Sequence, residues 1–484
     1  MSHPGEEKKE DHEGLSPETF FSKRLSNVLM GISAPISTSG LLNLEKDQAV
    51  SITNSQTQSV HTIQPAQANS STDGYGSAAT TKLLERQAEE LKDLVAEMPQ
   101  ASFGQGKQTK QDKAVRDALQ LSGKDFEINI SDQQLESILT QVKENLLLET
   151  DIVAELYSLN VYQKGGKFLK HKDTPRGDDM IGTLLICLPS LFCGGDLKVQ
   201  MGDEDATYFV GGDTWSGERK GGLYRWWDNR YRKDDPLVLP WCAFFADVDH
   251  EIKPVSGGVR MTVAYLLRRK DAASASVHMP RTIKPDEQGS IFEEQLARAL
   301  KDKTFLNDGG KIGFPCMHLY TNKDVFPRGK TSDDPLSAKQ VKNLKGKDLM
   351  VANAALSCNL DVYLVPYLSH DCQADEGDMR LEKFPSKKKC PKYMDDDDVA
   401  SHFGAKPCGR DRCADEEQPW NHANVWILGY GVSKQAKTSV GYTQNYNFEG
   451  YFGNEASEAT FYVQSALHIQ VPGVKEACRL KLLG

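Results

Sequence analysis

The sequence predicts an α+β fold in which a β-sandwich or jelly roll core follows N-terminal helices and precedes a C-terminal mixed α/β region. Three observations indicate this class. Short apolar runs bounded by Gly, Pro and Asp clusters fill the middle of the chain, which is the pattern of strands joined by turns. Before this part, apolar residues recur at helical spacing. After it, helical and strand patterns are mixed.

Residues 1–80 are expected to be disordered or loosely attached, because they hold few large apolar groups to offset the entropy of ordering. Residues 81–150 are expected to be a helical lead-in. Apolar residues at helical spacing between Lys82 and Met98 predict an amphipathic helix. The run "SDQQLESILTQVKENLLLE", which starts at Ser131, opens with a Ser-x-x-Gln capping box and predicts a second helix.

Residues 151–270 are expected to form the strand-rich domain. Its five apolar runs read "AELYSLNVY", "GTLLICLP", "DLKVQ", "WCAFFADV" and "VRMTVAYLL". Several short strands with turn residues between them are typical of sandwiches and jelly rolls.

Residues 271–484 are expected to form a C-terminal domain packed on the strand-rich one. Its predicted helices are "SIFEEQLARAL", capped at Ser290, and "LKGKDLMVANAAL", and its predicted strands are "DVYLVPYL", "NVWILGY" and "TFYVQSALHIQVP". The charged stretch near 375–420 is expected to be a disordered loop. Four cysteines in and around it have irregular spacings, so free thiols are favoured and a metal site is left open: Cys372, Cys390, Cys408 and Cys413.

Charge and hydropathy exclude two classes of partner. The 484 residues include 58 basic and 68 acidic ones, and the net charge of -10 gives no global support for nucleic-acid binding. No run approaches the roughly 18 apolar residues of a membrane span, and the charged N-terminus lacks the apolar core of a secretory signal. We therefore expect a cytoplasmic or nuclear protein.

The sequence contains a single His-x-Asp, formed by His171 and Asp173 in "FLKHKD". Side chains alternate faces on an extended strand, so Leu169 and these two residues should point inward. Phe168, Lys170 and Lys172 should then point outward. An imidazole and a carboxylate side by side are two of the three ligands of the facial triad that binds non-haem Fe(II).

The predicted third ligand is His250, which follows an apolar strand in "FFADVDHEIKPVSGGVRMTVAYLL". Arg260 stands ten residues later, and its guanidinium can grip the far carboxylate of 2-oxoglutarate bidentately. Thr262 shares its face and can add a hydroxyl bond. The Gly257-Gly258 turn is expected to place His250 and Arg260 on neighbouring strands.

These residues resemble a known family. "YQKGGKFLKHKD", "GTLLICLP", "CGGDLKV" and "HEIKPVSGGVRMTVAY" are similar to the catalytic domain of Fe(II)- and 2-oxoglutarate-dependent dioxygenases of the prolyl 4-hydroxylase type, over roughly residues 156–267. The resemblance implies a double-stranded β-helix, Fe(II) held by the His-x-Asp pair and His250, 2-oxoglutarate gripped by Arg260, and ascorbate as a reductant of the iron. It also implies that Tyr162 assists the cosubstrate.

The sequence departs from the family pattern at two positions. Collagen-type prolyl 4-hydroxylases carry lysine where Arg260 stands, and several relatives carry tyrosine at the position of Cys187. The expected substrate is a prolyl residue of a protein or peptide. A small-molecule oxygenase of secondary metabolism, a non-catalytic interaction module and a cupin-like zinc site remain alternatives, and the sequence does not indicate the oligomeric state.

Two further roles are left open. Asp247 and Asp249 flank the strand of His250, and either could orient its ring or only be solvated. After residue 270 no histidine has an acidic residue two positions later, so the C-terminal half is not expected to hold a second triad. It is expected to shape substrate access or recruit the target, or only to stabilise the fold.

Overall fold

The computed structural model describes residues 15–63, 77–209, 237–270, 287–325, 334–366, 423–427, 453–454, 462–476 and 479, apart from gaps at 33, 46–47, 106–107, 178, 202–206 and 464. The charged stretch near 375–420 and Cys372, Cys390, Cys408 and Cys413 lie outside these residues. Within them, no helix is long and apolar enough to cross a membrane.

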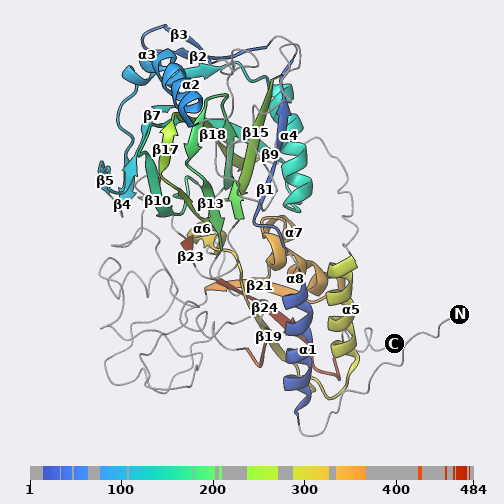
Figure 1. The fold of residues 1–484 in the computed structure, drawn as a ribbon. Coiled ribbons are helices and arrows are strands. Elements are labelled where there is room, and N and C mark those ends of the chain that lie inside the picture. The colour runs from blue at the N-terminus through green and yellow to red at the C-terminus, as the bar shows by residue number, and fades with distance from the viewer. Residues whose placement is uncertain are drawn as a thin grey trace, which may run out of the picture.

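Two antiparallel sheets, built mainly from the middle of the chain, lie in the upper part of Figure 1. The six-stranded sheet has the order β1 (Ser37–Asn43), β15 (Val238–Phe245), β11 (Met180–Cys187), β18 (Arg260–Arg269), β9 (Ile152–Tyr162) and β7 (Leu119–Ser122). The five-stranded sheet has the order β14 (Thr207–Phe209), β13 (Leu197–Gln200), β16 (Asp249–Ile252), β10 (Lys167–His171) and β6 (Arg116–Asp117). The strands predicted in residues 151–270 are therefore confirmed.

Both sheets contribute to one apolar core. Leu159 and Phe244 of the six-stranded sheet belong to the same buried cluster as Phe168 and Val199 of the five-stranded sheet. Burial of this shared surface is the main force that holds the two sheets together. The arrangement is sandwich-like, as two packed layers around one core require.

Smaller strand pairs surround the sandwich. They are β12 (Phe192–Gly194) with β17 (Val255–Gly258), and β4 (Phe103–Gln105) with β5 (Gln108–Lys110). A three-stranded sheet joins β3 (Val60–Ile63), β2 (Val50–Asn54) and β8 (Phe126–Ile128).

The helices before the sandwich match their sequence patterns. The helix expected between Lys82 and Met98 is present as α2 (Ser77–Glu90) and α3 (Lys92–Ala96). Helix α4 (Asp132–Asn145) has the predicted capping box between Ser131 and Gln134, and it packs against β1 and β9. The capping box satisfies backbone N–H groups that the first helical turn leaves unpaired.

The expectation that residues 1–80 are disordered or loosely attached is wrong for residues 15–63. Helix α1 (Pro17–Gly31) buries Phe21, Leu25 and Leu29 in the core of the C-terminal region, and β1 pairs along its length with β15. Three apolar side chains on one helix face, and the pairing of β1 with β15 along one edge, offset the ordering entropy despite the polar composition.

The C-terminal region has its own core and a four-stranded sheet in the lower part of Figure 1. The sheet order is β21 (Asp361–Pro366), β24 (Ser465–Val471), β19 (Gly310–Pro315) and β22 (Val425–Trp426). Its other elements are α5 (Glu287–Lys301), β20 (Tyr320–Thr321), α6 (Asn322–Val325), α7 (Ala338–Val341), α8 (Gly346–Ser357) and β23 (Tyr462–Val463). Where the structure describes this region, helices and strands lie in the predicted segments, but Ser290 lies inside α5 and is not its cap.

The position of α1 generates a prediction. Leu25 is fully buried, whereas Met30 on the same helix is 43% exposed. Leu25→Ala should lower the free energy of unfolding by about 2 to 5 kcal/mol because it opens a cavity in the C-terminal core. Chemical denaturation measures the effect, and Met30→Ala, expected to lie within about 0.5 kcal/mol of wild type, is the control. Equal stability of the two variants would contradict the packing of α1.

Candidate metal centre

Two strands bring the predicted ligands together. Strands β10 and β16 are antiparallel neighbours in which His171 is paired directly with His250, and Asp173 follows just after β10. Residues opposite each other on paired strands point to the same face. One ligand atom from each of the three side chains therefore lies within 4.8 Å of the others, and all three residues are buried.

A β-bulge in β10 sets the direction of these side chains. Phe168 pairs with Ile252 and His171 pairs with His250, so three steps on β10 match two steps on β16. The predicted alternation is therefore wrong at this point: Phe168 is buried and Leu169 is 39% exposed. A bulge inserts an extra residue and re-aims the side chains beside it. As a result the Phe168 ring stacks on the His171 ring, with centroids 3.6 Å apart.

Lys172, which was predicted to point outward, is also buried. Its Nζ donates to the backbone oxygen of Asp247 at 2.7 Å and lies 3.0 Å from Oδ1 of Asp249. The ion pair explains how a lysine is tolerated inside the protein.

Both imidazole rings are held by a backbone hydrogen bond at Nδ1. Nδ1–H of His171 donates to the backbone oxygen of Leu169 at 2.8 Å, and Nδ1–H of His250 donates to that of Val248 at 3.1 Å. A carbonyl oxygen only accepts, so the proton is on Nδ1 and the Nε2 lone pair faces the centre. Burial, and then the neighbouring His250, hold the pKa of His171 well below its usual value, which favours the neutral form that binds metals.

The carboxylate of Asp173 receives a hydrogen bond on each oxygen. Thr183 Oγ1 donates to Oδ2 at 2.5 Å, and Asn454 Nδ2 donates to Oδ1 at 2.8 Å. Oδ1 also lies 3.7 Å from Nε2 of His250. Two imidazole nitrogens and one carboxylate oxygen, with their orientation fixed by such partners, are the donor set that suits non-haem Fe(II).

Arg260 lies on the same side as these ligands. Thr183 and Cys187 share one face of β11, and Cys187 is paired with Thr262 of β18, whose face Arg260 shares. Because Thr183 binds Asp173, this face of the six-stranded sheet is the one that meets the metal ligands. The prediction that His250 and Arg260 lie on neighbouring strands is wrong. His250 is on β16 of the five-stranded sheet, and Arg260 is on β18 of the six-stranded sheet.

Gly258 does not form the predicted hairpin turn. It ends β17, which pairs with β12, and it has a φ of 72°. A Cβ at this position would lie 2.2 Å from the backbone oxygen of Leu191, so glycine is required for the chain to pass from β17 into β18.

The guanidinium of Arg260 is buried without a full set of partners. Among the residues that the structure describes, its Nε and Nη1 atoms have no hydrogen-bond acceptor. Burying such donors unpaired is costly, so the site fits an anionic ligand that would accept from them. Tyr162 is the strand partner of Arg260, with its ring centroid 5.6 Å from Cζ, and Thr262 is buried two residues along.

The thiols near Arg260 do not neutralise it. Burial raises the pKa of Cys187 to about 11 and that of Cys242 to about 12, against an opposing effect of the Arg260 charge. Both thiols are therefore protonated and neutral near pH 7, and the positive charge of Arg260 remains available to a ligand.

Asp247 and Asp249, which were candidates for orienting the His250 ring, pair with other residues instead. Asp247 accepts from Lys345 Nζ at 2.8 Å and from His318 Nδ1 at 3.0 Å, both in the C-terminal region. Burial alone would raise the pKa of Asp247, but Lys345 and His318 hold it well below its usual range. Asp249 pairs with Lys170 and Lys172.

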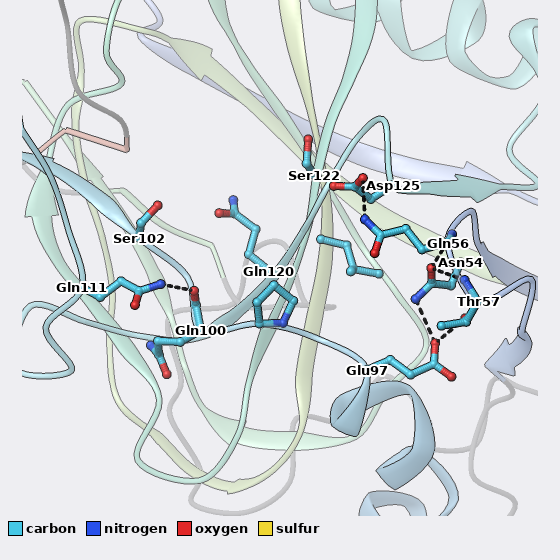
Figure 2. Close-up of a pocket in the computed structure, with 12 residues that line it drawn as sticks. Asn54, Gln56, Thr57, Glu97, Gln100, Ser102, Gln111, Gln120, Ser122 and Asp125 are labelled. Atoms are coloured by element: carbon cyan, nitrogen blue, oxygen red, sulfur yellow. Dashed lines mark hydrogen bonds between the residues drawn. The ribbon is translucent and has the colours of Figure 1, made fainter.

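A separate polar cleft of about 380 Å³ is lined by none of the six predicted site residues. Figure 2 shows the Glu97 carboxylate facing Asn54 and Thr57, and the Gln111 side chain bonded to the backbone of Gln100. Its lining includes the carboxylates of Glu97 and Asp125 but no histidine or cysteine, so this cleft lacks the imidazole ligands of the proposed centre.

Comparison with known proteins gives a likeness among solved structures alone. No family model and no curated protein matches the chain. A prolyl-4-hydroxylase from Pseudomonas putida is 15% identical over 40% of this chain and 89% of its own, with a TM-score of 0.23. A prolyl hydroxylase from Trichoplax adhaerens, solved with a hypoxia inducible factor peptide fragment, is 17% identical over 42% of this chain and 84% of its own, with a TM-score of 0.24.

A viral collagen prolyl hydroxylase from Paramecium Bursaria Chlorella virus-1, solved as a 2-oxoglutarate complex, is 13% identical over 41% of this chain and 94% of its own, with a TM-score of 0.21. A 2-oxoglutarate–Fe(II) oxygenase family protein from Burkholderia pseudomallei is also similar, at 13% identity over 43% of this chain and 97% of its own, with a TM-score of 0.22. At these identities and TM-scores, the functional assignment depends on the geometry of the site.

The ligand geometry generates a prediction. His171→Ala and Asp173→Ala should each abolish Fe(II) binding, because two remaining ligands cannot complete the facial triad. Metal analysis after anaerobic reconstitution measures the loss, and circular dichroism checks the fold. His61→Ala, a histidine in β3 outside the centre, is the control and should retain wild-type iron. Full iron occupancy in both ligand variants would remove the assignment.

Proposed function

We propose that the chain is an Fe(II)- and 2-oxoglutarate-dependent dioxygenase that hydroxylates a C–H bond, with a double-stranded β-helix (jelly roll) as its core. The observation that carries the proposal is the pairing of two features on one side of the sandwich. A buried His-Asp-His cluster has ligand atoms within 4.8 Å of one another, and it faces the sheet that carries a buried arginine with unpaired N–H groups.

In this proposal His171, Asp173 and His250 hold Fe(II), and Arg260 grips the far carboxylate of 2-oxoglutarate. Thr262 and Tyr162 add hydroxyl groups beside it. When bound, the iron supplies the coupling of 2-oxoglutarate decarboxylation to C–H hydroxylation, with succinate and carbon dioxide as co-products. We further propose ascorbate as the reductant that keeps the iron in its ferrous form.

The residues around the ligands would keep them rigid and dry. Phe168 stacks on His171, and the Phe244 ring lies 4.6 Å from the His250 ring. Apolar rings on both imidazoles exclude water from the metal side, which protects a reactive centre from side reactions. Backbone bonds to both Nδ1 atoms keep the rings from rotating.

The proposed substrate is a prolyl residue of a protein or peptide, on the strength of the sequence resemblance to prolyl 4-hydroxylases. Two alternatives remain: an oxygenase that acts on a small metabolite, and a non-catalytic module that has no substrate. The experiments below separate them.

Arg260→Ala should raise the dissociation constant of 2-oxoglutarate while iron stays bound. The lost bidentate contact is worth about 2 to 4 kcal/mol in a buried site, or roughly a 30- to 1,000-fold weaker affinity. Anaerobic calorimetric titration of the Fe(II)-loaded protein measures it. Arg268→Ala is the matched control, since Arg268 lies on the same strand but pairs with Asp179 and Glu155. An unchanged affinity in Arg260→Ala would place the carboxylate elsewhere.

The wild-type protein should release succinate from 2-oxoglutarate when supplied with Fe(II) and oxygen, and His171→Ala should not. Isotopic oxygen then identifies the substrate: a proline-containing peptide from a cell extract should gain one labelled oxygen atom. Labelled metabolites without labelled peptides would favour the small-molecule alternative. Iron binding without any succinate release would favour the non-catalytic module.

A further inference from the structure

We propose that Asn454 is a positioning residue for the metal centre, which it reaches from the C-terminal region, 281 residues along the chain from Asp173. The inference rests on the proposed function, because it assigns a role in holding the metal-binding carboxylate. No sequence pattern around Asn454 indicated this role.

The orientation of the Asn454 amide is fixed by its two partners. Its oxygen accepts from the backbone N–H of Thr174 at 2.9 Å, and its nitrogen donates to Asp173 Oδ1 at 2.8 Å. A backbone N–H only donates and a carboxylate only accepts, so the amide cannot be reversed without losing both bonds. Asn454 is itself 7% exposed, so water cannot readily replace it.

The bond acts on the carboxylate oxygen that faces the other ligands. Oδ1 of Asp173 is the oxygen 3.7 Å from His250 Nε2, whereas Oδ2 accepts from Thr183. With one donor on each oxygen, rotation of the carboxylate about its Cβ–Cγ bond is blocked from both sides. Each carboxylate oxygen has more than one acceptor position, so Oδ1 can accept from Asn454 and still bind a metal.

Backbone contacts deliver Asn454 to this place. Gly453 exchanges two hydrogen bonds with Gly104, at 2.9 and 3.0 Å, and forms a parallel bridge with Lys172. In addition, the Tyr462 hydroxyl donates to the backbone oxygen of Asp173 at 3.2 Å. The C-terminal region thus contacts Asp173 at both its side chain and its backbone.

The test uses a substitution that separates the two bonds of Asn454. In Asn454→Asp one carboxylate oxygen still accepts from Thr174, but the other faces Asp173 as an acceptor and not as a donor. If Asn454 only caps Thr174, this variant should bind the metal at least as tightly as the wild type, because the added negative charge attracts a cation. If Asn454 positions Asp173, the dissociation constant should rise roughly 10- to 100-fold, as for other residues that orient metal ligands.

Co(II) is the probe, because its visible absorption reports both occupancy and coordination geometry without turnover. We expect weaker binding and an altered spectrum for Asn454→Asp, and weaker binding for Asn454→Ala, which adds no charge. Asn353→Asp is the matched control, since Asn353 likewise donates to a carboxylate, that of Glu149, outside the centre. It should match the wild type in affinity and spectrum.

A Co(II) affinity equal to or above that of the wild type, with the wild-type spectrum, in Asn454→Asp would overturn the inference. If thermal melting shows that this variant does not fold, Asn454→Ala decides, and an unchanged Co(II) affinity there has the same meaning. Failure of the wild type itself to bind Co(II) or Fe(II) would instead overturn the proposed function, so the two failures are distinguishable.

Discussion

The antiparallel pairing of His171 with His250 is the constraint on which the site depends. It places two imidazoles on one face of the five-stranded sheet, and the bulge before His171 sets the angle at which they point. A shift of register by one residue would turn one of them to the opposite face. The buried residues on both sides of these strands hold that register, so the sandwich core and the metal ligands are stabilised by the same packing.

Two buried charged groups in the site are treated in opposite ways. Asp173 has a donor on each carboxylate oxygen, whereas two guanidinium nitrogens of Arg260, Nε and Nη1, have no partner among the described residues. An unpaired buried cation destabilises the folded state unless an anionic partner compensates for its desolvation. This contrast is expected if Asp173 holds a metal ion in one fixed orientation and Arg260 binds an anionic ligand that supplies its missing acceptors.

Segments before and after the sandwich strands connect the two cores. Strand β1 extends the six-stranded sheet, while α1, only a few residues earlier, packs in the C-terminal core. From the C-terminal region, Lys345 and His318 pair with Asp247 of the sandwich, and Asn454 donates to Asp173. Division of the chain into successive independent domains therefore understates how much the sandwich depends on residues outside 151–270.

The sequence by itself determined the elements whose signals are local. Apolar runs between turn residues located the strands of residues 151–270, and helical periodicity located α4. The His-x-Asp spacing indicated His171 and Asp173, the position of His250 after an apolar strand indicated the third ligand, and the fold brings these three residues together. Only the tertiary structure decided the bulge that buries Phe168, the ordering of residues 15–63, the lysine partners of Asp247 and Asp249, and the reach of Asn454. The physical reason is that these features depend on partners far apart in the chain, and a short sequence window carries no record of which distant group will satisfy a buried hydrogen bond or cover an apolar face.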